Sequence, residues 1–355
     1  MKQTMNMAIV GLGNVGRAFA ELFEQRRDLL LAQRGAPARV VGVSDRTGFL
    51  SSPDGLDMPA ICRRKAAGES LSAMGAAMGS GPTDISEMIA AFARAGANVL
   101  VETLPGGLQT QGEPAISIAA AALRHGMHVV TANKAVLLFG LRRLESLAAE
   151  NGAQLGHSGA TCAALPTLSF ARRELAGARI TGLRGILNGT TNYVLTRMNE
   201  DGLDFNAALA EAQTKGIAEP DPRYDIEGRD SAAKLTILAN ALLHAEARLD
   251  DVQRTGIDAI PETLRDQARQ SGGAIKLIAR ASLNNGVVEL RVEPEIVPPT
   301  DSLFAVRGSN KAVEFTTDLY GTLLVAGGAS SRQAVAATIL KDVLAVTDSL
   351  QVMRN

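Results

Sequence analysis

The N-terminal segment MNMAIVGLGNVGRAFAELFEQ constrains the fold more than any other part of the chain. An apolar run leads directly into a GxGxxG motif, and an amphipathic helical pattern follows it. Glycines let the backbone turn tightly and approach a pyrophosphate, which then meets the amides of a helix N-terminus. A GxGxxG motif alone is a weak signal, but in this position it predicts a Rossmann dinucleotide-binding domain. The residues predicted to contact the dinucleotide here are Gly11, Leu12, Gly13, Asn14, Val15 and Gly16.

The second predicted strand, in ARVVGVSDRTG, ends at Asp45. This is the position at which the fold meets the adenosine ribose, and an acid there favours the free 2′-hydroxyl of NAD. Arg46 follows immediately and could face the 2′-phosphate of NADP. The two residues therefore leave the choice between NAD and NADP open.

The rest of the first domain shows alternating strand and helix signals. Residues 48–81 are rich in Gly, Ser and Pro and predict an irregular excursion around a short helical patch. DISEMIAAFARAG then has helical spacing, and the apolar ANVLVETLP predicts a strand buried in a parallel sheet. Thr103 lies at the carboxyl end of this strand, where open α/β sheets bind ligands, although it could equally cap a turn.

An acid-rich stretch, EPDPRYDIEGRDSAAK at residues 219–234, carries five carboxylates against two arginines. Its prolines and glycine disfavour a helix, and the apolar LTILANALLHA that follows predicts a helix with Lys234 in its first turn. Asp230 then lies either at the helix N-cap or one turn before Lys234, where the two could pair. A lysine ringed by acids suits proton transfer and binding of a polar substrate, but the spacing alone equally suits a solvated loop. The five acids are Glu219, Asp221, Asp225, Glu227 and Asp230.

Residues 185–240 closely resemble the catalytic region of homoserine dehydrogenases. The match depends on GILNGTTNY and on the spacing ExDPxxDxxGxDxxxK, and it extends over almost the whole chain. It implies NAD- or NADP-dependent interconversion of L-homoserine and L-aspartate 4-semialdehyde, in threonine and methionine biosynthesis. It also implies an α/β protein with a Rossmann domain at 1–150, completed by a C-terminal helix at 329–355. An α+β catalytic and dimerisation domain would occupy 151–328.

The resemblance assigns roles to particular residues. Lys234 and Lys134, the latter in a TANK segment, are implied as the catalytic lysines, with Lys134 also near the cofactor. Glu219 and Asp230 would hold the substrate ammonium group, and Asp225 would orient a lysine or tune its proton affinity.

The same resemblance places other residues around substrate and cofactor. Gly189 and Thr190 would lie beside the substrate, where Thr190 or Thr191 would cap a helix. Thr103 would face the nicotinamide. Lys65 is similar in position to a basic residue that some members use for the 2′-phosphate, and its alternative is a solvated lysine in a charge run.

Two segments depart from the family pattern. HSGATCAALPTL stands where members usually have EAxVGxGxP, whose backbone carbonyls hold a sodium ion in some of them. Carbonyl ligation does not need particular side chains, so the resemblance still implies a Na⁺ site, although Cys162 replaces a glycine. The closing GxGAGxxxTA is altered to GGASSRQAVA, and no regulatory domain is expected after it. The implied sodium ligands are the carbonyls of Ser158, Thr161, Ala163 and Leu165.

Composition excludes several classes of protein. The 36 basic and 37 acidic side chains give a formal charge of −1, which indicates neither a nucleic-acid nor an anionic-membrane partner. Cys62 and Cys162 stand far apart without a CxxC pattern, as expected of reduced thiols. No signal peptide or membrane span is evident, so a cytoplasmic protein is predicted, and the resemblance implies a homodimer.

Two other functions remain open at this point. One is a dehydrogenase of another small amino acid, such as aspartate, although that enzyme would not need the whole homoserine-type acidic loop. The other is a redox sensor that binds NAD or NADP without turnover, which the altered GATCAALP and GGASSRQAVA segments favour.

Overall fold

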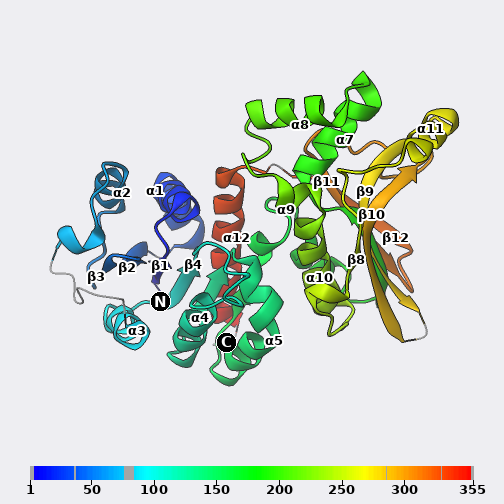
Figure 1. Ribbon diagram of the computed structural model, residues 1–355. Helices are drawn as coiled ribbons and strands as arrows, with labels where there is room; N and C mark the ends of the chain where they lie inside the picture. The colour runs from blue at the N-terminus through cyan, green and yellow to red at the C-terminus, as the bar shows by residue number, and fades with distance from the viewer. Residues whose placement is uncertain (1–3, 36, 76–83, 285, 329, 353–355) are drawn as a thin grey trace. The chain divides into compact units, whose positions relative to one another are not determined.

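Two six-stranded sheets organise the chain, one in each of two units. The computed structural model describes residues 4–35, 37–75, 84–284, 286–328 and 330–352 (Figure 1). The first unit comprises Met1–Ala160 and Ser331–Asn355, and the second comprises Thr161–Ser330. The mixed α/β architecture agrees with the predicted fold class.

The sheet of the first unit has the strand order β3-β2-β1-β4-β5-β6. Its neighbours pair in parallel except β3, which is antiparallel to β2. The central strands are buried on both faces, as Met7, Ile9 and Val101 show with 0% exposure, which explains their continuous apolar runs. The strands are β1 (Met5–Val10), β2 (Ala38–Asp45), β3 (Gly48–Ser51), β4 (Val99–Glu102), β5 (His128–Thr131) and β6 (Leu155–Gly156).

Helices bury both faces of this sheet (Figure 1). One core holds Phe19 and Phe23 of α1 with Ile339 and Val343 of α12, so that segments from the two ends of the chain pack together. The other core holds Phe92 of α3 and the alanine-rich face of α4. The helices are α1 (Asn14–Arg34), α2 (Met58–Ala66), α3 (Ile85–Arg94), α4 (Ala115–Arg124), α5 (Lys134–Glu150) and α12 (Arg332–Val352), with short turns η1 (Leu71–Ala73) and η2 (Ser158–Ala160).

The stretch after β2 is more regular than the sequence predicts. Gly48, with φ +141°, lets the chain reverse, and β3 pairs with β2 from Gly48 opposite Asp45. Asp57 then caps α2 by accepting a hydrogen bond from the amide of Ala60 at 2.9 Å. The short helical patch predicted in this stretch is present as α2, whereas the prediction of irregular structure was wrong for β3, because it gave the turn residues more weight than the short apolar run between them. Residues 76–81 of that stretch lie outside the described residues.

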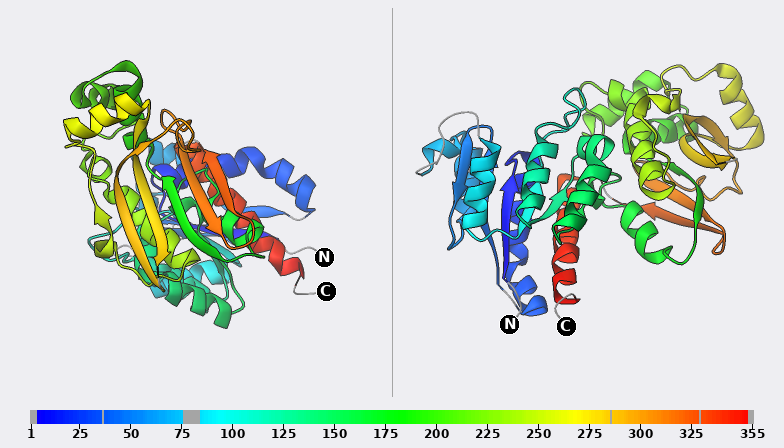
Figure 2. Two further views of the ribbon diagram at one scale, coloured as in Figure 1. Left: turned by 90° about the vertical axis from the view of Figure 1, so that its right-hand side faces the viewer. Right: turned by 90° about the horizontal axis from the view of Figure 1, so that it is seen from below.

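The sheet of the second unit has the order β12-β11-β7-β9-β10-β8, seen face-on in the left view of Figure 2. Its pairs are antiparallel apart from β8, which runs parallel to β10. Strands β11 and β12 form a hairpin that turns at Gly321. The strands are β7 (Ile180–Ile186), β8 (Gln253–Arg254), β9 (Ala274–Asn284), β10 (Val287–Val297), β11 (Lys311–Thr317) and β12 (Thr322–Gly327).

Helix α10 packs on β7, β9 and β10. All ten residues from Asp230 to Ala239 are buried. Two predictions need correction here: the acid-rich stretch contains the short helix α9, and α10 begins at Arg229, which puts Lys234 in its second turn. The helices are α6 (Thr167–Glu174), α7 (Gly189–Asp201), α8 (Phe205–Thr214), α9 (Arg223–Ile226), α10 (Arg229–Leu242) and α11 (Glu262–Ser271), with η3 (Leu249–Asp251).

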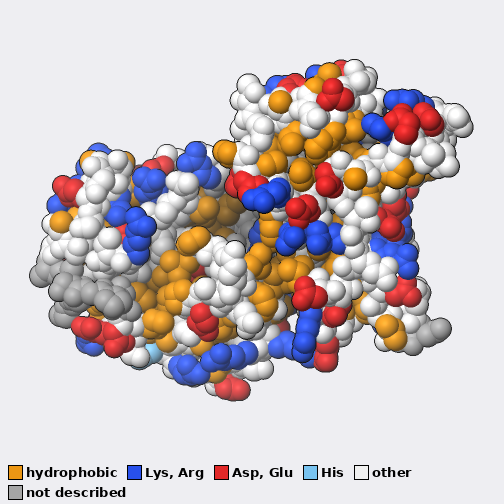
Figure 3. Space-filling view, viewed as in Figure 1, with side chains coloured by type: hydrophobic (Ala, Val, Ile, Leu, Met, Phe, Trp, Pro, Cys, Tyr) orange, Lys and Arg blue, Asp and Glu red, His pale blue; other side chains and the backbone are white. Residues whose placement is uncertain are grey.

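Charges of both signs are mixed over the face drawn in Figure 3, in keeping with the near-zero formal charge. Among the described helices, none combines the length and the hydropathy that a membrane span requires.

Candidate active site

The glycine turn after β1 can be built only with glycine at two of its three positions. Gly11 has φ +95°, and a Cβ on Gly16 would lie 2.0 Å from the Gly11 carbonyl oxygen. A Cβ on Gly13, by contrast, would meet no atom within 4 Å. Gly13 is also the N-cap of α1 and has no side chain to offer to the first amides of the helix. Open space in front of such amides suits the pyrophosphate of a dinucleotide.

Asp45 and Lys65 form an ion pair at the end of β2. Lys65 Nζ lies 2.6 Å from Asp45 Oδ2, and Asp45 Oδ1 accepts a hydrogen bond from the Thr47 amide at 2.7 Å. Burial raises the pKa of Asp45, but the hydrogen bonds from Lys65 and Thr47 outweigh it and hold the pKa below its ordinary value. Lys65 is therefore not the solvated lysine of a charge run, whereas Arg46 is exposed.

Thr103 links the end of β4 to the glycine turn. Its hydroxyl donates a hydrogen bond to the Gly11 carbonyl at 2.6 Å, and the side chain is half-buried. The hydroxyl oxygen keeps acceptor capacity, which is compatible with the predicted place beside a nicotinamide.

Glu102, at the end of β4, is a buried acid that the sequence interpretation missed. It is 0% exposed and accepts hydrogen bonds from the Thr131 hydroxyl at 2.5 Å and the Leu104 amide at 2.7 Å. Burial raises its pKa to about 7. The available signal was an acid ending an otherwise apolar strand.

Lys134 is the first residue of α5. Asn133 caps this helix by accepting a hydrogen bond from the Ala135 amide at 3.0 Å, and its own amide donates to the Thr131 hydroxyl at 3.0 Å. Thr131 in turn donates to Glu102, so a continuous chain of hydrogen bonds fixes the residues before Lys134. The predicted second lysine therefore starts a helix and has a half-buried side chain.

The second unit brings Lys234 and Asp230 together. Lys234 Nζ lies 2.6 Å from Asp230 Oδ2 and donates to the Leu187 carbonyl at 2.8 Å. The two residues are only 9% and 4% exposed, so this charge pair is largely removed from water. The sequence left open whether Asp230 caps the helix or pairs with Lys234 from one turn away. The structure has the pairing, because Gly228 rather than Asp230 is the N-cap of α10.

Asn188 joins this pair to a second acid. Its side-chain amide donates to Asp225 Oδ1 at 2.7 Å and to Asp230 Oδ2 at 2.8 Å. Its side-chain oxygen Oδ1 accepts a hydrogen bond from the Thr191 amide at 2.9 Å, which makes Asn188 the N-cap of α7. The prediction that Thr190 or Thr191 caps this helix was wrong. Asparagine is a preferred N-cap residue, and that preference was the signal available in the sequence.

The negative charge of Asp230 acts on the carboxyl group of Asp225. Burial raises its pKa first, the negative charge of Asp230 raises it further, and the hydrogen bond from Asn188 opposes both. Gly189 is the first residue of α7, and Thr190 is buried, with its hydroxyl donating to the Ile217 carbonyl at 3.1 Å.

The five acids of the loop divide into an inner and an outer group. Asp225 and Asp230 belong to a largely buried polar cluster with Asn188 and Lys234. Asp221 pairs instead with Arg223, and Glu227 pairs with Arg229, each at 2.6 Å near the surface. Glu219, predicted to hold the substrate ammonium group, is exposed. Among the hydrogen bonds of the described residues, only its backbone carbonyl takes part, accepting from the side chain of Gln213. The structure therefore does not bring Glu219 into the described cluster.

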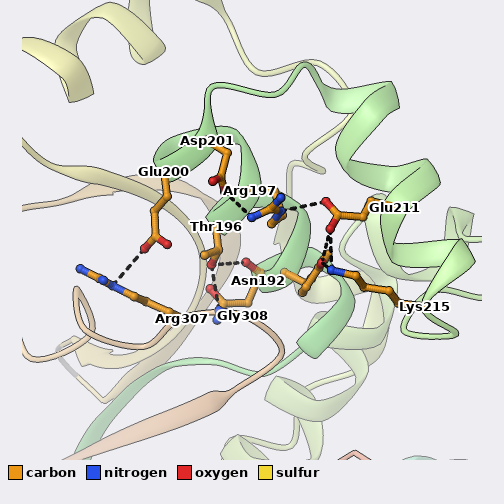
Figure 4. A network of polar contacts seen from close by, with 10 residues as sticks. Asn192, Thr196, Arg197, Glu200, Asp201, Glu211, Lys215, Arg307 and Gly308 are labelled. Carbon is orange, nitrogen blue, oxygen red and sulfur yellow. Dashed lines mark hydrogen bonds and ion pairs between the residues drawn. The ribbon is translucent and has the colours of Figure 1, made fainter.

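Polar contacts fix the helix that carries Gly189 and Thr190 (Figure 4). Thr196 donates to the Asn192 carbonyl at 2.7 Å and accepts from the Gly308 amide at 3.1 Å. Arg307 pairs with Glu200 at 3.0 Å, and Arg197 pairs with Glu211 at 2.8 Å. The helix is thus tied both to α8 and to the segment that precedes β11.

Two family models match the chain: "Homoserine dehydrogenase, NAD binding domain" over residues 11–157 and "Homoserine dehydrogenase" over residues 166–344. The chain belongs to the homoserine dehydrogenase family. An NAD(+)-dependent homoserine dehydrogenase of Pseudomonas canavaninivorans is 36% identical over 348 residues, which cover 97% of this chain and 96% of that protein. A homoserine dehydrogenase of Methanocaldococcus jannaschii is also 36% identical, with coverage of 97% and 99%. Membership makes this chain an NAD-dependent oxidoreductase of that family.

Solved structures of homoserine dehydrogenases share the fold. A putative homoserine dehydrogenase from Archaeoglobus fulgidus superposes with a TM-score of 0.81 at 32% identity, covering 97% of this chain and 99% of that one. A homoserine dehydrogenase from Thiobacillus denitrificans gives a TM-score of 0.79 at 28% identity, covering 99% of this chain and 75% of that one.

The four residues whose carbonyls were predicted to hold sodium are divided between the two units. Thr161, Ala163 and Leu165 belong to the second unit and Ser158 to the first. The Leu165 carbonyl already accepts a hydrogen bond from the Thr167 amide at 2.9 Å, and Ala163 has φ +54°. No group of three or more His, Cys, Asp or Glu that could hold a metal occurs in the part of the chain that the structure describes. Sodium binding stays a prediction.

Proposed function

We propose that this chain catalyses the NAD-dependent interconversion of L-homoserine and L-aspartate 4-semialdehyde. The observation that carries the proposal is the buried pair of Lys234 and Asp230, at 2.6 Å, with Asn188 donating to the same carboxylate. A buried ammonium group held by a carboxylate beside the N-terminus of a helix suits a carbonyl that becomes an alkoxide. Family membership favours homoserine over another small amino acid as the substrate.

The reaction needs a cation at the reacting oxygen and a group that moves its proton. In reduction of the aldehyde, the Lys234 ammonium group stabilises the developing alkoxide and delivers a proton to it. In oxidation, Lys234 acts as the neutral amine and accepts the proton of the substrate hydroxyl, which makes it the ammonium group again. Asp230 and the Leu187 carbonyl hold the Lys234 nitrogen in place during both steps. Lys134, at the start of α5, is the second lysine in this proposal.

The substrate ammonium group needs carboxylates. Asp230 belongs to the cluster, and Asp225, linked to it through Asn188, keeps the cluster's charge negative. Gly189 and Thr190 present the first amides of α7 beside these acids. Glu219 is proposed as a further contact for the ammonium group from its exposed position on the loop.

NAD fits the first unit, where the open space at Gly13 and the first amides of α1 would hold its pyrophosphate. When bound, NAD supplies the hydride acceptor of the reaction. We propose NAD rather than NADP as the preferred cofactor, because the Asp45 carboxylate would repel a 2′-phosphate. Lys65, the nearby cation, is engaged by that same carboxylate.

We also propose a homodimer that uses the sheet of the second unit. One face of this sheet carries a row of ion pairs, with Arg184 bound to Glu314 at 2.8 Å and Arg280 bound to Glu295 at 2.7 Å. The molar mass in solution, measured by light scattering, tests this part.

The experiment that tests the activity follows the absorbance of reduced nicotinamide after mixing the protein with L-homoserine and either NAD or NADP. We expect a rise with homoserine and NAD, no rise with L-aspartate or L-serine, and a much slower rise with NADP. A protein that binds NAD in a direct binding assay but oxidises none of these substrates would contradict the proposal and favour the sensor.

A further inference from the structure

A second buried lysine, Lys311, lies in the unit that carries Lys234. It is the first residue of β11 and is 2% exposed. Its Nζ donates a hydrogen bond to the Ser330 hydroxyl, and Ser330 itself is exposed. Among the residues that the structure describes, no carboxylate lies within ion-pairing distance of this ammonium group. Lys311 therefore buries a charge with a neutral partner.

Such an arrangement costs free energy unless a ligand compensates it. Burial lowers the pKa of Lys311, and the positive charge of Lys234 lowers it further, while Asp230 and Cys162 act in the opposite direction. The two lysines and Asp230 thus share one electrostatic environment. A buried charge without a charged partner lowers stability, and an apolar residue would serve the fold better, so the position of Lys311 relative to the site decides whether it has a role there.

The residues next to Lys311 lie beside the start of α7. A Cβ on Gly189 would lie 2.8 Å from the Ser309 carbonyl oxygen and 3.5 Å from the Ser330 hydroxyl oxygen. Asn192, on the same helix, donates to the Asn310 carbonyl at 3.0 Å and so fixes the backbone directly before Lys311. The Ser330 hydroxyl, and with it the ammonium group, therefore lies beside a residue proposed to contact the substrate.

We propose that Lys311 binds the α-carboxylate of the substrate. This inference rests on the proposed function and deepens it. The substrate carries a reacting oxygen, an ammonium group and a carboxylate. Lys234 is proposed to bind the reacting oxygen, and the carboxylates of the acid-rich loop are proposed to bind the ammonium group. Lys311 and the first amides of α7 can then bind the substrate carboxylate. The altered segment GGASSRQAVA thereby gains a role, since its Ser330 holds this ammonium group toward the site.

The test compares two substrates that differ only in the carboxylate. L-Homoserine and 3-aminopropan-1-ol are assayed with the intact protein and with Lys311→Met. Loss of a charge-assisted hydrogen bond should lower kcat/KM for homoserine by about 10- to 100-fold, mainly through KM. The value for 3-aminopropan-1-ol should change by less than about threefold, because that substrate has no carboxylate to lose a contact. If it reacts too slowly, inhibition constants of L-2-aminobutyrate and n-propylamine give the same comparison.

Lys276 provides a matched control. It is also 2% exposed in the same unit, and its Nζ donates to the Asn192 side chain at 3.2 Å and the Val306 carbonyl at 2.7 Å. Lys276→Met should leave the ratio of the two substrates unchanged even where it lowers stability. Lys311→Gln replaces Lys311→Met if the latter does not fold.

Other outcomes would overturn the inference. An equal fall for both substrates would make Lys311 a structural residue, and no change for either would remove it from the site. If Lys311→Met made kcat/KM more sensitive to added NaCl but left the ratio of the two substrates unchanged, the Lys311 ammonium group would interact with a charge other than the substrate carboxylate. These results are distinguishable from failure of the proposed function, in which the unsubstituted protein would itself not oxidise homoserine.

Discussion

Lys234 Nζ and Asp230 Oδ2 lie 2.6 Å apart on successive turns of α10, in a segment buried on all sides. The i,i+4 spacing brings the two side chains to one helix face, and the packing of α10 on the sheet removes them from water. Breaking one partner of a buried pair leaves an uncompensated charge, whereas the intact pair can hold a proton donor in a fixed place. Both the predicted chemistry and the local stability therefore depend on this contact.

Lys234→Met should lower kcat by about 10²- to 10⁴-fold, the usual contribution of a positioned general acid or base. The dissociation constant of NAD should stay nearly unchanged, because the cofactor contacts are assigned to the other unit. Steady-state kinetics and direct titration with NAD measure the two quantities. The double variant Lys234→Met/Asp230→Asn separates chemistry from folding, since it should regain stability without regaining activity. Activity within a few-fold of the parent would remove Lys234 from its role.

Asn188→Ala should shift the acid limb of the pH profile of kcat to higher pH. The Asn188 amide stabilises the ionised form of Asp225 and lowers its pKa, so its loss raises that pKa and delays ionisation as the pH rises. Loss of the α7 cap should also cost about 1 kcal/mol of stability. Asn199→Ala is the matched control, because Asn199 lies on the same helix and contacts only the Ile275 backbone among the described side-chain hydrogen bonds. An identical pH profile in both variants would show that Asp225 does not act in the reaction.

Asp45→Asn should raise the preference for NADP, expressed as kcat/KM for NADP relative to NAD, by about tenfold or more. The change removes the charge that repels a 2′-phosphate and frees Lys65, whose Nζ lies 2.6 Å from the carboxylate. The gain should disappear in Asp45→Asn/Lys65→Ala. A cofactor ratio that does not move in the single variant would place the ribose elsewhere.

Glu102→Gln should remove a pH dependence of stability. Burial raises the pKa of Glu102 from 4.5 to about 7, so the folded state holds a proton that the unfolded state releases between these values. Stability from this group is therefore complete below pH 4.5 and is lost as the pH rises through about 7, by about 3 kcal/mol in all. Denaturant unfolding at several pH values should show the variant gaining stability relative to the parent over this window. Parallel curves for the two proteins would mean that Glu102 is ionised throughout.

Local patterns in the sequence were sufficient to predict the glycine turn and the pairing of two site residues. The GxGxxG motif between a strand and a helix predicts the dinucleotide turn, because Gly11 and Gly16 are needed wherever that turn is built. The pairing of Asp230 with Lys234 also follows from helical spacing, once the helix is known to begin before Asp230. Both relationships span a few residues, so their geometry is set by backbone periodicity.

The tertiary structure decided the contacts between distant segments. Asn188 reaches acids 37 and 42 positions away, and Lys311 meets Ser330 across the β11–β12 hairpin. The outward position of Glu219 was not visible in the sequence, and the burial of Glu102 was indicated only by an acid at the end of an apolar strand. Such contacts depend on sheet order, strand register and helix packing, which determine which side chains share an interior and which of them lose their water. Spacing along the sequence indicates what residues can do, whereas packing determines which partners they have.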